Sequence, residues 1–487
     1  MKTAPITQEL LDDALTHQPN SASTLRSFNM LSRSILPLLL LAAAGSSRAD
    51  TKPVSYYQDL LPVFKRSCQG CHSPGKVKGE LDLTTIEAMK KGGKTGPAIQ
   101  PGQPEKSLLI EQISGDPPEM PKKGDPLSKD EIALIARWIR EGAIDDTPED
   151  KKNPYKLKGP PVYASAPVIS ALAYSPDGQW LAISGYHEVL LHHADGSGLA
   201  ARCVGESPRI ESIAFSKDGK LLAVSGGAPS VFGEIQVWNA ESHQLEHAYK
   251  YSSDSLYGAS FSPDGQKIAF GGADKIARIV AVQDGKELLH FDNHSDWVFA
   301  TTFTVDGQRL LTGSRDRAMK MINASNGQFI DDINKLLEAV FCMARNPKED
   351  QVAYGGDLAI PRVYKISDNQ GRTAANNDVN LVREFERQPG PIYAIAYSPD
   401  GAQIAVGGVS PEVRIYKVSD GSRVATLKGQ EGATFAVEFN PKKNEIAAGG
   451  YDGKLRIFEL PSGKLLKEFI PVPLKAPETK IAAASAK

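Results

Sequence analysis

The chain has 487 residues, which is too long for one ordinary hydrophobic core and predicts two or three domains. Its 56 basic and 58 acidic residues nearly cancel, and no run of lysine or arginine could follow a phosphate backbone, which argues against a nucleic-acid partner. Four cysteines are too few to suggest a disulfide framework.

The first predicted element is a secretory signal in residues 30–49. An apolar run of 11 residues, Ile35–Gly45, follows a short basic region and precedes the small-x-small cleavage site Ser47–Ala49. The run is well short of the roughly 18 residues that a membrane span needs. We therefore expect residues 1–49 to be an N-terminal extension and signal peptide, with the true start at Met30. The mature protein is then periplasmic or secreted and does not span the membrane, although an uncleaved anchor stays open.

Residues 50–144 predict a small all-α domain with loops rich in glycine and proline. Its clearest element is a helix in residues 127–143, which begins with a capping box formed by Ser128 and Glu131. The helix carries isoleucines on one face, and Trp138 lies beside them. We expect these apolar side chains to form the core of the domain.

The most informative motif of this segment is Cys-Gln-Gly-Cys-His at residues 68–72. A zinc site usually needs a second cysteine pair, but Cys203 and Cys342 are single and fall in the later part of the chain. A dithiol oxidoreductase motif is expected near a βαβ pattern, without a histidine directly after the second cysteine. Neither interpretation accounts for all the residues of the motif.

Covalent haem attachment does account for them. In this motif the thiols of Cys68 and Cys71 form thioethers with the haem vinyl groups, and His72 is the proximal ligand of the iron. Haem c of this kind is attached outside the cytoplasm, in agreement with the signal peptide. The sequence therefore predicts one covalently bound haem c.

The distal ligand can be approached by elimination, because residues 50–160 contain no histidine outside the motif and only two methionines. Met89 lies in a predicted short helix that ends at Gly92, where packing is the expected role. Met120 lies in a proline-rich loop that could hold a thioether at the iron. We expect Met120 to be the distal ligand, and an open sixth position is the alternative.

A charged, proline-rich linker at residues 145–163 separates this domain from a set of repeats. Turns such as AYSPDG and SFSPDG recur seven times, two of them in degenerate form, at intervals of about 41 to about 51 residues. Each turn joins an aromatic-bearing strand to a small apolar strand, and a third strand with alternating residues follows. The sequence predicts an all-β, seven-bladed propeller in residues 164–475 and a flexible tail in residues 476–487.

The repeats resemble the WD-repeat family over residues 164–475, although few copies keep its signature dipeptide. The fourth copy is the nearest to the family pattern. The resemblance implies that His294 of this copy joins an aspartate in a structural hydrogen-bond network, and that the propeller chiefly binds partner proteins through its faces.

Residues 57–143 resemble the planctomycete-type cytochrome c domain in a series of motifs: DLLPVF, CQGCH, KGELDL, GKTGPAIQPGQPEKSLL, EMP and WIREGA. That family carries one covalent haem and is often fused to repeat domains. The resemblance implies thioether roles for Cys68 and Cys71, proximal ligation by His72 and distal ligation by Met120.

We therefore predict a multidomain, extracytoplasmic c-type cytochrome that transfers single electrons to or from a partner protein and binds proteins through its propeller. Two alternatives stay open: a redox enzyme with a second cofactor in the propeller, and a haem-based sensor or scaffold. The histidines that could hold a second cofactor lie in the first three copies of the repeat: His187, His192, His193, His243, His247 and His290.

Overall fold

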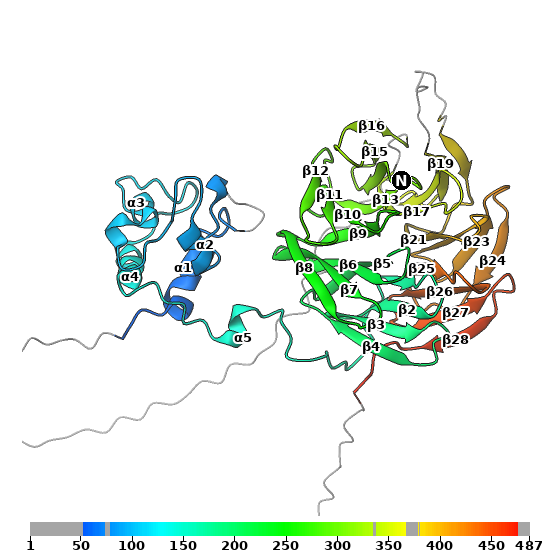
Figure 1. Cartoon of the computed structure of the whole chain (residues 1–487), viewed down its shortest axis with the longest axis horizontal. Coiled ribbons are helices and arrows are strands. Elements are labelled where there is room, and N and C mark those ends of the chain that lie inside the picture. The colour runs from blue at the N-terminus through cyan, green and yellow to red at the C-terminus, as the bar shows by residue number, and fades with distance from the viewer. Residues whose placement is uncertain (1–51, 74–77, 335–337, 367–377, 379, 476–487) are drawn as a thin grey trace, which may run out of the picture. The chain divides into compact units, whose positions relative to one another are not determined.

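The computed structural model describes residues 52–73, 78–334, 338–366, 378 and 380–475. These residues form a small helical domain and a β-propeller (Figure 1). The predicted signal peptide, the start at Met30 and the tail at 476–487 lie outside the described residues. The fold class predicted from the sequence is confirmed.

The helical domain consists of short helices joined by irregular loops. Its α-helices are α1 (Leu61–Ser67), α2 (Ile86–Lys91), α3 (Leu108–Ile113) and α4 (Lys129–Arg140). Shorter π- and 3₁₀-turns are η2 (Tyr56–Leu60), η3 (Lys78–Glu80) and η4 (Pro104–Lys106). A fifth helix, α5 (Glu149–Lys152), lies in the predicted linker.

Local sequence signals determine where the two best-defined helices begin and end. The hydroxyl of Thr85 accepts a hydrogen bond from the backbone N–H of Ala88 at the start of α2, and Gly92 ends that helix with φ +75°. At the start of α4, the predicted capping box between Ser128 and Glu131 is present.

One apolar core holds these helices together. Leu60 and Phe64 before the haem motif are fully buried, and Trp138 and Ile139 of α4 are buried with them. The Trp138 ring stacks on Tyr56 at a centroid distance of 5.4 Å, and its indole N–H donates to the carbonyl of Ile144. The predicted core role of Trp138 is confirmed.

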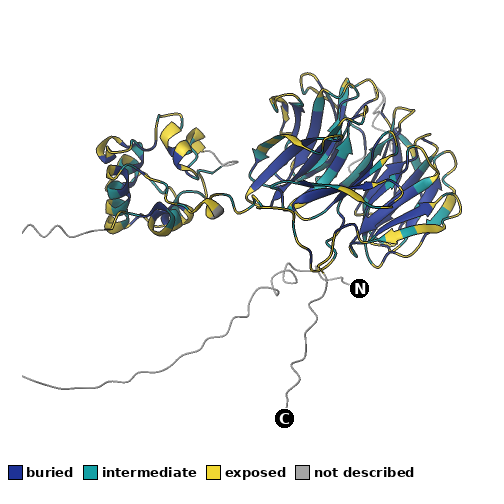
Figure 2. Ribbon diagram, turned by 60° about the horizontal axis from the view of Figure 1, so that its bottom comes forward, coloured by how far each residue is buried: buried dark blue, intermediate teal, exposed yellow. Residues whose placement is uncertain are grey.

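The second part of the chain is a seven-bladed propeller in which each blade is one four-stranded antiparallel sheet made of consecutive strands. Blades one to four are formed by β1 (Leu172–Tyr174), β2 (Trp180–Ser184), β3 (Glu188–His193), β4 (Leu199–Val204), β5 (Arg209–Phe215), β6 (Leu221–Ala228), β7 (Phe232–Asn239), β8 (Leu245–Ser252), β9 (Leu256–Phe261), β10 (Lys267–Gly272), β11 (Ala277–Ala281), β12 (Glu287–Phe291), β13 (Val298–Phe303), β14 (Arg309–Ser314), β15 (Met319–Asn323) and β16 (Phe329–Asp332). Blades five to seven are formed by β17 (Val340–Arg345), β18 (Gln351–Gly356), β19 (Arg362–Lys365), β20 (Leu381–Glu384), β21 (Ile392–Tyr397), β22 (Gln403–Gly408), β23 (Val413–Lys417), β24 (Arg423–Leu427), β25 (Thr434–Phe439), β26 (Glu445–Gly450), β27 (Leu455–Glu459) and β28 (Leu465–Phe469). The strands are mostly buried, and the loops that join them are mostly exposed (Figure 2).

The repeated turn between the first and second strands has a simple polar structure. In five blades the first hydroxyl of the turn donates to the aspartate two residues later, at 2.5 to 2.6 Å, in the pairs Ser175–Asp177, Ser216–Asp218, Ser262–Asp264, Thr304–Asp306 and Ser398–Asp400. Asn346 and Asn440 accept backbone N–H groups at the same place in the two degenerate copies. The repeat is therefore a turn that satisfies its own hydrogen bonds.

The glycines that end the second strands are required by close backbone packing. A Cβ atom added at Gly408 would lie 2.2 Å from the carbonyl oxygen of Pro391, and one at Gly450 would lie 2.0 Å from that of Ala433. In both blades the oxygen belongs to the residue just before the first strand. Only glycine lets the two strands approach this closely.

A column of buried basic side chains occupies the third strands. Arg456 of β27 is fully buried and contacts Asp452 and Glu468, each at 2.7 Å. Arg362 of β19 lies between Glu338 and Glu384 in the same way. Arg278 and Arg414 take the corresponding positions in blades three and six. Each of these blades thus contains an arginine that is largely buried and paired with carboxylates, some of which remain partly exposed.

The ends of the propeller segment meet at the first blade. Tyr163 pairs with Leu474 through a parallel bridge, and Lys475 donates its backbone N–H to the carbonyl of Tyr163. The Tyr163 hydroxyl also donates to the buried carboxylate of Glu188 at 2.7 Å. Chain segments more than three hundred residues apart in sequence therefore stabilise the same blade.

Candidate functional site

The Cys-x-x-Cys-His motif forms a tight turn at the end of α1. Cys68 follows the last residue of that helix and still donates to the carbonyl of Phe64. The Cys68 carbonyl accepts from the backbone N–H groups of Cys71 and His72, at 3.2 and 3.1 Å. Because one carbonyl accepts both bonds, the second cysteine and the histidine are held close to the first cysteine.

A second segment fixes this turn in place. The carbonyl of His72 accepts from the backbone N–H of Leu83 at 2.9 Å. The side-chain amide of Gln69 donates to the carbonyl of Leu83 at 3.0 Å. Sequence reasoning did not find Gln69, because nothing in the motif indicates that its partner lies 14 residues away. Gln69 is therefore a positioning residue for the turn.

Neither thiol of the motif forms a disulfide. Cys68 is half-buried and Cys71 is exposed. Burial raises the pKa of Cys68 to about 11, against a smaller opposing effect of Arg66. Redox-active dithiols need the opposite shift, because the thiolate is the reactive form. The electrostatics of Cys68 thus argue against a dithiol oxidoreductase.

His72 has a ring nitrogen that the described residues leave unsatisfied. Its Nδ1 atom is buried and has no hydrogen-bond partner among them. Unsatisfied buried polar atoms are uncommon and often mark functional positions. Two free thiols and a histidine that has a restrained backbone and an unsatisfied ring nitrogen form a donor set that fits a covalently attached haem.

The structure distinguishes the two methionines of the domain by burial. Met89 of α2 is fully buried in the apolar core, as the sequence predicted. Met120 is only half-buried and packs against the same core as Cys68. Its backbone N–H donates to the carbonyl of Gln112 at 2.9 Å, which ties the loop to the end of α3. Of the two sulfur atoms, that of Met120 is therefore the better candidate for a ligand.

The propeller histidines proposed for a second cofactor have separate local contacts. His192 bonds the carbonyl of Pro471 at 2.9 Å, and burial lowers its pKa. His193 stacks on Trp180, and His290 contacts Glu287. Within the described residues, no group of three or more histidine, cysteine, aspartate or glutamate side chains is arranged to hold a metal ion.

The structural role expected of His294 is confirmed. Its Nδ1 atom lies 2.8 Å from a carboxylate oxygen of Asp316, and its Nε2 atom lies 2.7 Å from the hydroxyl of Thr312. The His294 side chain is fully buried. It therefore anchors the blade-four loop before β13 to the loop after β14.

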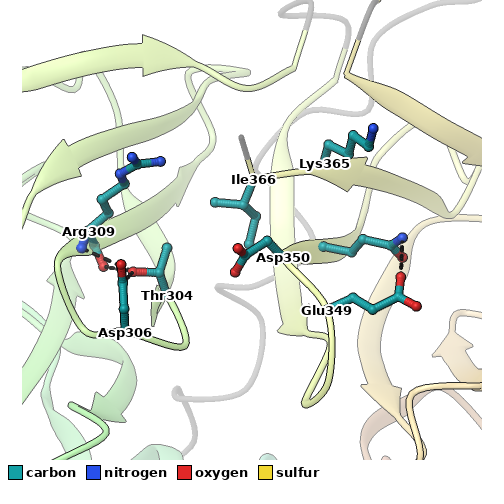
Figure 3. Close-up of a pocket in the computed structure, with 8 residues that line it drawn as sticks. Thr304, Asp306, Arg309, Glu349, Asp350, Lys365 and Ile366 are labelled. Carbon is teal, nitrogen blue, oxygen red and sulfur yellow. Dashed lines mark hydrogen bonds between the residues drawn. The ribbon is translucent and has the colours of Figure 1, made fainter. Parts of the chain in front are cut away.

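A polar hollow of about 410 Å³ lies between blades four and five (Figure 3). Asp306 and Thr304 line one side and bond each other within their own turn. Glu349 lines the other side and accepts from Gln351. Asp306 and Glu349 thus already have hydrogen-bond partners within their own turns. The hollow is the space between these two surface turns, and these groups need no ligand.

None of the helices in the described ranges has the length and apolar character needed to cross a membrane.

The fold and the donor set define a protein that joins a cytochrome c-like helical domain to a WD-repeat propeller. Residues 68–124 match the family model Planctomycete cytochrome C, and this range contains all four candidate haem residues. Residues 285–323, 379–417 and 421–459 match the family model WD domain, G-beta repeat. No curated protein matches the chain. Both family resemblances inferred from the sequence are confirmed.

Proposed function

We propose that the chain is an extracytoplasmic electron-transfer protein that carries one haem c, bound through thioethers at Cys68 and Cys71. In this proposal His72 and Met120 are the axial ligands. The observation that carries the proposal is the turn that collects Cys68, Cys71 and His72 around one carbonyl, with a buried ring nitrogen of His72 unsatisfied. When bound, such a haem supplies one reversible electron.

The chain itself contributes position and exclusion of water. The Cys68 carbonyl and Leu83 restrain the backbone of His72 from two sides. The apolar core that contains Phe64 and Trp138 packs against Cys68 and Met120. This packing keeps water away from the core side of both residues. The hydrophobic surroundings of a metal group control solvent access to it and tune its potential.

The proposed roles of the two cysteines can be tested by single substitutions in the full-length protein. We expect Cys68→Ala and Cys71→Ala each to remove one thioether, so that double attachment is lost and the absorption maxima of the reduced pyridine complex shift. Cys342→Ala is the matched control, because this free cysteine belongs to the propeller. Unchanged double attachment in either motif variant would refute the assignment.

The extracytoplasmic location rests on residues 30–49 and needs its own test. N-terminal sequencing of the mature protein should find a new terminus just after Ala49. A mature chain that retains residues 35–45 would instead support the uncleaved anchor.

For the propeller we propose a role in binding partner proteins, including the redox partner. The WD-repeat match supports an interaction role. The alternative of a second cofactor is not favoured, since the candidate histidines have separate contacts and form no donor cluster among the described residues.

A further inference from the structure

The first strands of blades two and four to seven share an irregularity that leaves one residue of each strand without a pairing partner. In blade four, Val298 pairs with Ser314 and Ala300 pairs with Gly313, so Phe299 is an extra residue without a partner. The same bulge leaves out Phe341 in blade five, Tyr393 in blade six and Phe435 in blade seven. Bulges of this kind are common next to functional sites, where they change the direction of a side chain.

The four bulged rings continue into Tyr257 of blade three, which pairs with Gly271, and form a band of rings that we call the aromatic arc: Tyr257, Phe299, Phe341, Tyr393 and Phe435. Successive ring centroids are 5.2, 5.7, 5.9 and 5.5 Å apart. Each ring is only half-buried. The arc therefore extends over five blades and presents aromatic surface.

Blade two places a carboxylate where blades four to seven place a ring. Ile210 pairs with Gly226 and Ser212 pairs with Ser225, so the bulged residue is Glu211. The Glu211 side chain is only 12% exposed, and its Oε1 atom has no hydrogen-bond partner among the described residues. Burial raises the pKa of Glu211. An acidic group in this environment is stabilised by a cation.

The chain's own nearest cation does not fill this role. The Nε atom of Arg209 lies 3.2 Å from Glu211 Oε1, but the geometry makes no hydrogen bond and the Arg209 side chain is 64% exposed. Arg209 is also absent from the lining of the cavity next to Glu211. The Arg209 end of the pair thus lies largely in solvent, which weakens the ion pair.

A cavity of about 230 Å³ connects Glu211 to the aromatic arc at the centre of the propeller. Its lining includes Glu211, Tyr393 and Phe435 and residues from the first strand of every blade. Pockets for whole small molecules usually start at about 300 Å³, so this cavity has room for a single long side chain.

The same face already holds one cation by this chemistry. The guanidinium carbon of Arg315 lies 4.7 Å from the ring centroid of Trp297, and its Nε donates to Asp296 at 2.8 Å. Trp297 stacks on Tyr257 of the arc at a centroid distance of 6.2 Å. An aromatic face with a carboxylate beside it is therefore a cation site in this propeller.

Exposed apolar side chains lie near the mouth of this central cavity, which we call the channel. Tyr451 is 66% exposed and its N–H donates to the carbonyl of Ala433, just before the bulged strand. In blade six, Val409 is 47% exposed, and its backbone N–H donates to the carbonyl of Pro391, the residue just before β21. Such a rim offers contact area to a polypeptide beyond the channel itself.

We propose that this face binds a partner polypeptide by taking one of its lysine side chains into the channel, with the ammonium at Glu211 and the methylenes along the aromatic arc. The proposal rests on the interaction role proposed above for the propeller. It identifies the binding face as the one that carries the second-to-third-strand loops, and the required partner feature as an accessible lysine.

The test uses the full-length haem-loaded protein and two blocked pentapeptides, Gly-Gly-Lys-Gly-Gly and the same peptide with norleucine in place of lysine. Isothermal titration should show at least about tenfold tighter binding of the lysine peptide. Glu211→Gln should remove this preference. Arg209→Ala should strengthen lysine binding, because it removes a competing cation.

Glu459→Gln is the matched control, since Glu459 ends β27 at the opposite end of the strands, and it should leave the preference unchanged. Equal binding of the two peptides, or binding of neither, overturns the proposal, as does a preference that survives in Glu211→Gln. The haem spectrum of each variant reports haem attachment and ligation independently of peptide binding. A failure of the lysine proposal can therefore be told apart from a failure of the haem proposal.

Discussion

Met120 and Met89 differ in what their sulfur atoms can reach. Met89 is enclosed by the core, whereas Met120 is half-buried and packs against the outside of the same core, as Cys68 does. We expect Met120→Ala to remove the sulfur-to-iron charge-transfer band of the oxidised protein and to lower the reduction potential, because thioether ligation raises it.

Met89→Leu is the matched control for this experiment, because it keeps the apolar volume in the core and should leave the band in place. If the band persists in Met120→Ala and disappears in Met89→Leu, the distal ligand is Met89. If the wild-type protein has no such band and binds carbon monoxide readily, the sixth position is open.

Asp316 makes the stability of blade four depend on pH. Burial alone would raise its pKa, but the interaction with His294 and two backbone N–H groups outweighs this and lowers the pKa of Asp316 to about 2. Because the unfolded value is about 3.9, the stabilisation is complete above that pH and is lost as the pH falls toward 2.

We therefore expect Asp316→Asn to reduce the free energy of unfolding at neutral pH by about 2 kcal/mol. The acid side of the stability profile, between about pH 5 and pH 2, should become shallower, because the variant has no carboxylate to protonate there. Denaturant unfolding followed by far-ultraviolet circular dichroism at several pH values measures both effects. A profile parallel to that of the wild type would contradict the account.

The motif residues could be predicted from the sequence because their chemistry is local. Cys68, Cys71 and His72 lie within five residues, and their spacing, together with the lack of a second cysteine pair, favours haem over zinc or a redox dithiol. The unsatisfied Nδ1 of His72 and the bond from Gln69 to Leu83 depend on packing between segments, so no local pattern could show them.

Among the elements, the third strands depart most from their sequence pattern. In KLRIFEL the alternation of residues suggests an exposed Arg456, yet its side chain is fully buried between Asp452 and Glu468. Removal of one member of a buried ion pair leaves the other charges unpaired, which costs about 3–5 kcal/mol.

We expect Arg456→Met to destabilise the propeller by that amount, in a thermal or denaturant titration of the full-length protein. Arg423→Met is the control: Arg423 is 41% exposed and lies 3.7 Å from Glu386, and its loss should change stability by no more than about 0.5 kcal/mol. Equal effects of the two substitutions would show that burial of the Arg456 pair has no special weight.

The first strands show a second limit of sequence reasoning. The aromatic residue before each turn recurs in the sequence and can be recognised there. A bulge depends on how two strands pair, so the sequence of either strand alone does not predict it. For this reason the aromatic arc and Glu211 were found only in the structure.

At the scale of the whole molecule, the number of blades was predictable because five copies carry the same turn and two carry a degenerate form of it. Ser175 and Asp177 in the first blade and Ser398 and Asp400 in the sixth make the same bond. The closed ring was also predicted, but the contact between Tyr163 and Leu474 was not, because these residues lie at opposite ends of the propeller segment.

The two parts of the chain suggest two separate roles, haem binding and partner recognition. We propose that the helical domain carries one haem and that the propeller recognises the partner protein. The two family matches support these separate roles.

One redox titration of the purified full-length protein, combined with haem quantitation, tests the central claim most directly. The account predicts one covalently bound haem per chain and a single reversible one-electron transition across the whole titration. A second chromophore, a haem that can be extracted from the denatured chain, or the absence of any reversible transition would contradict it.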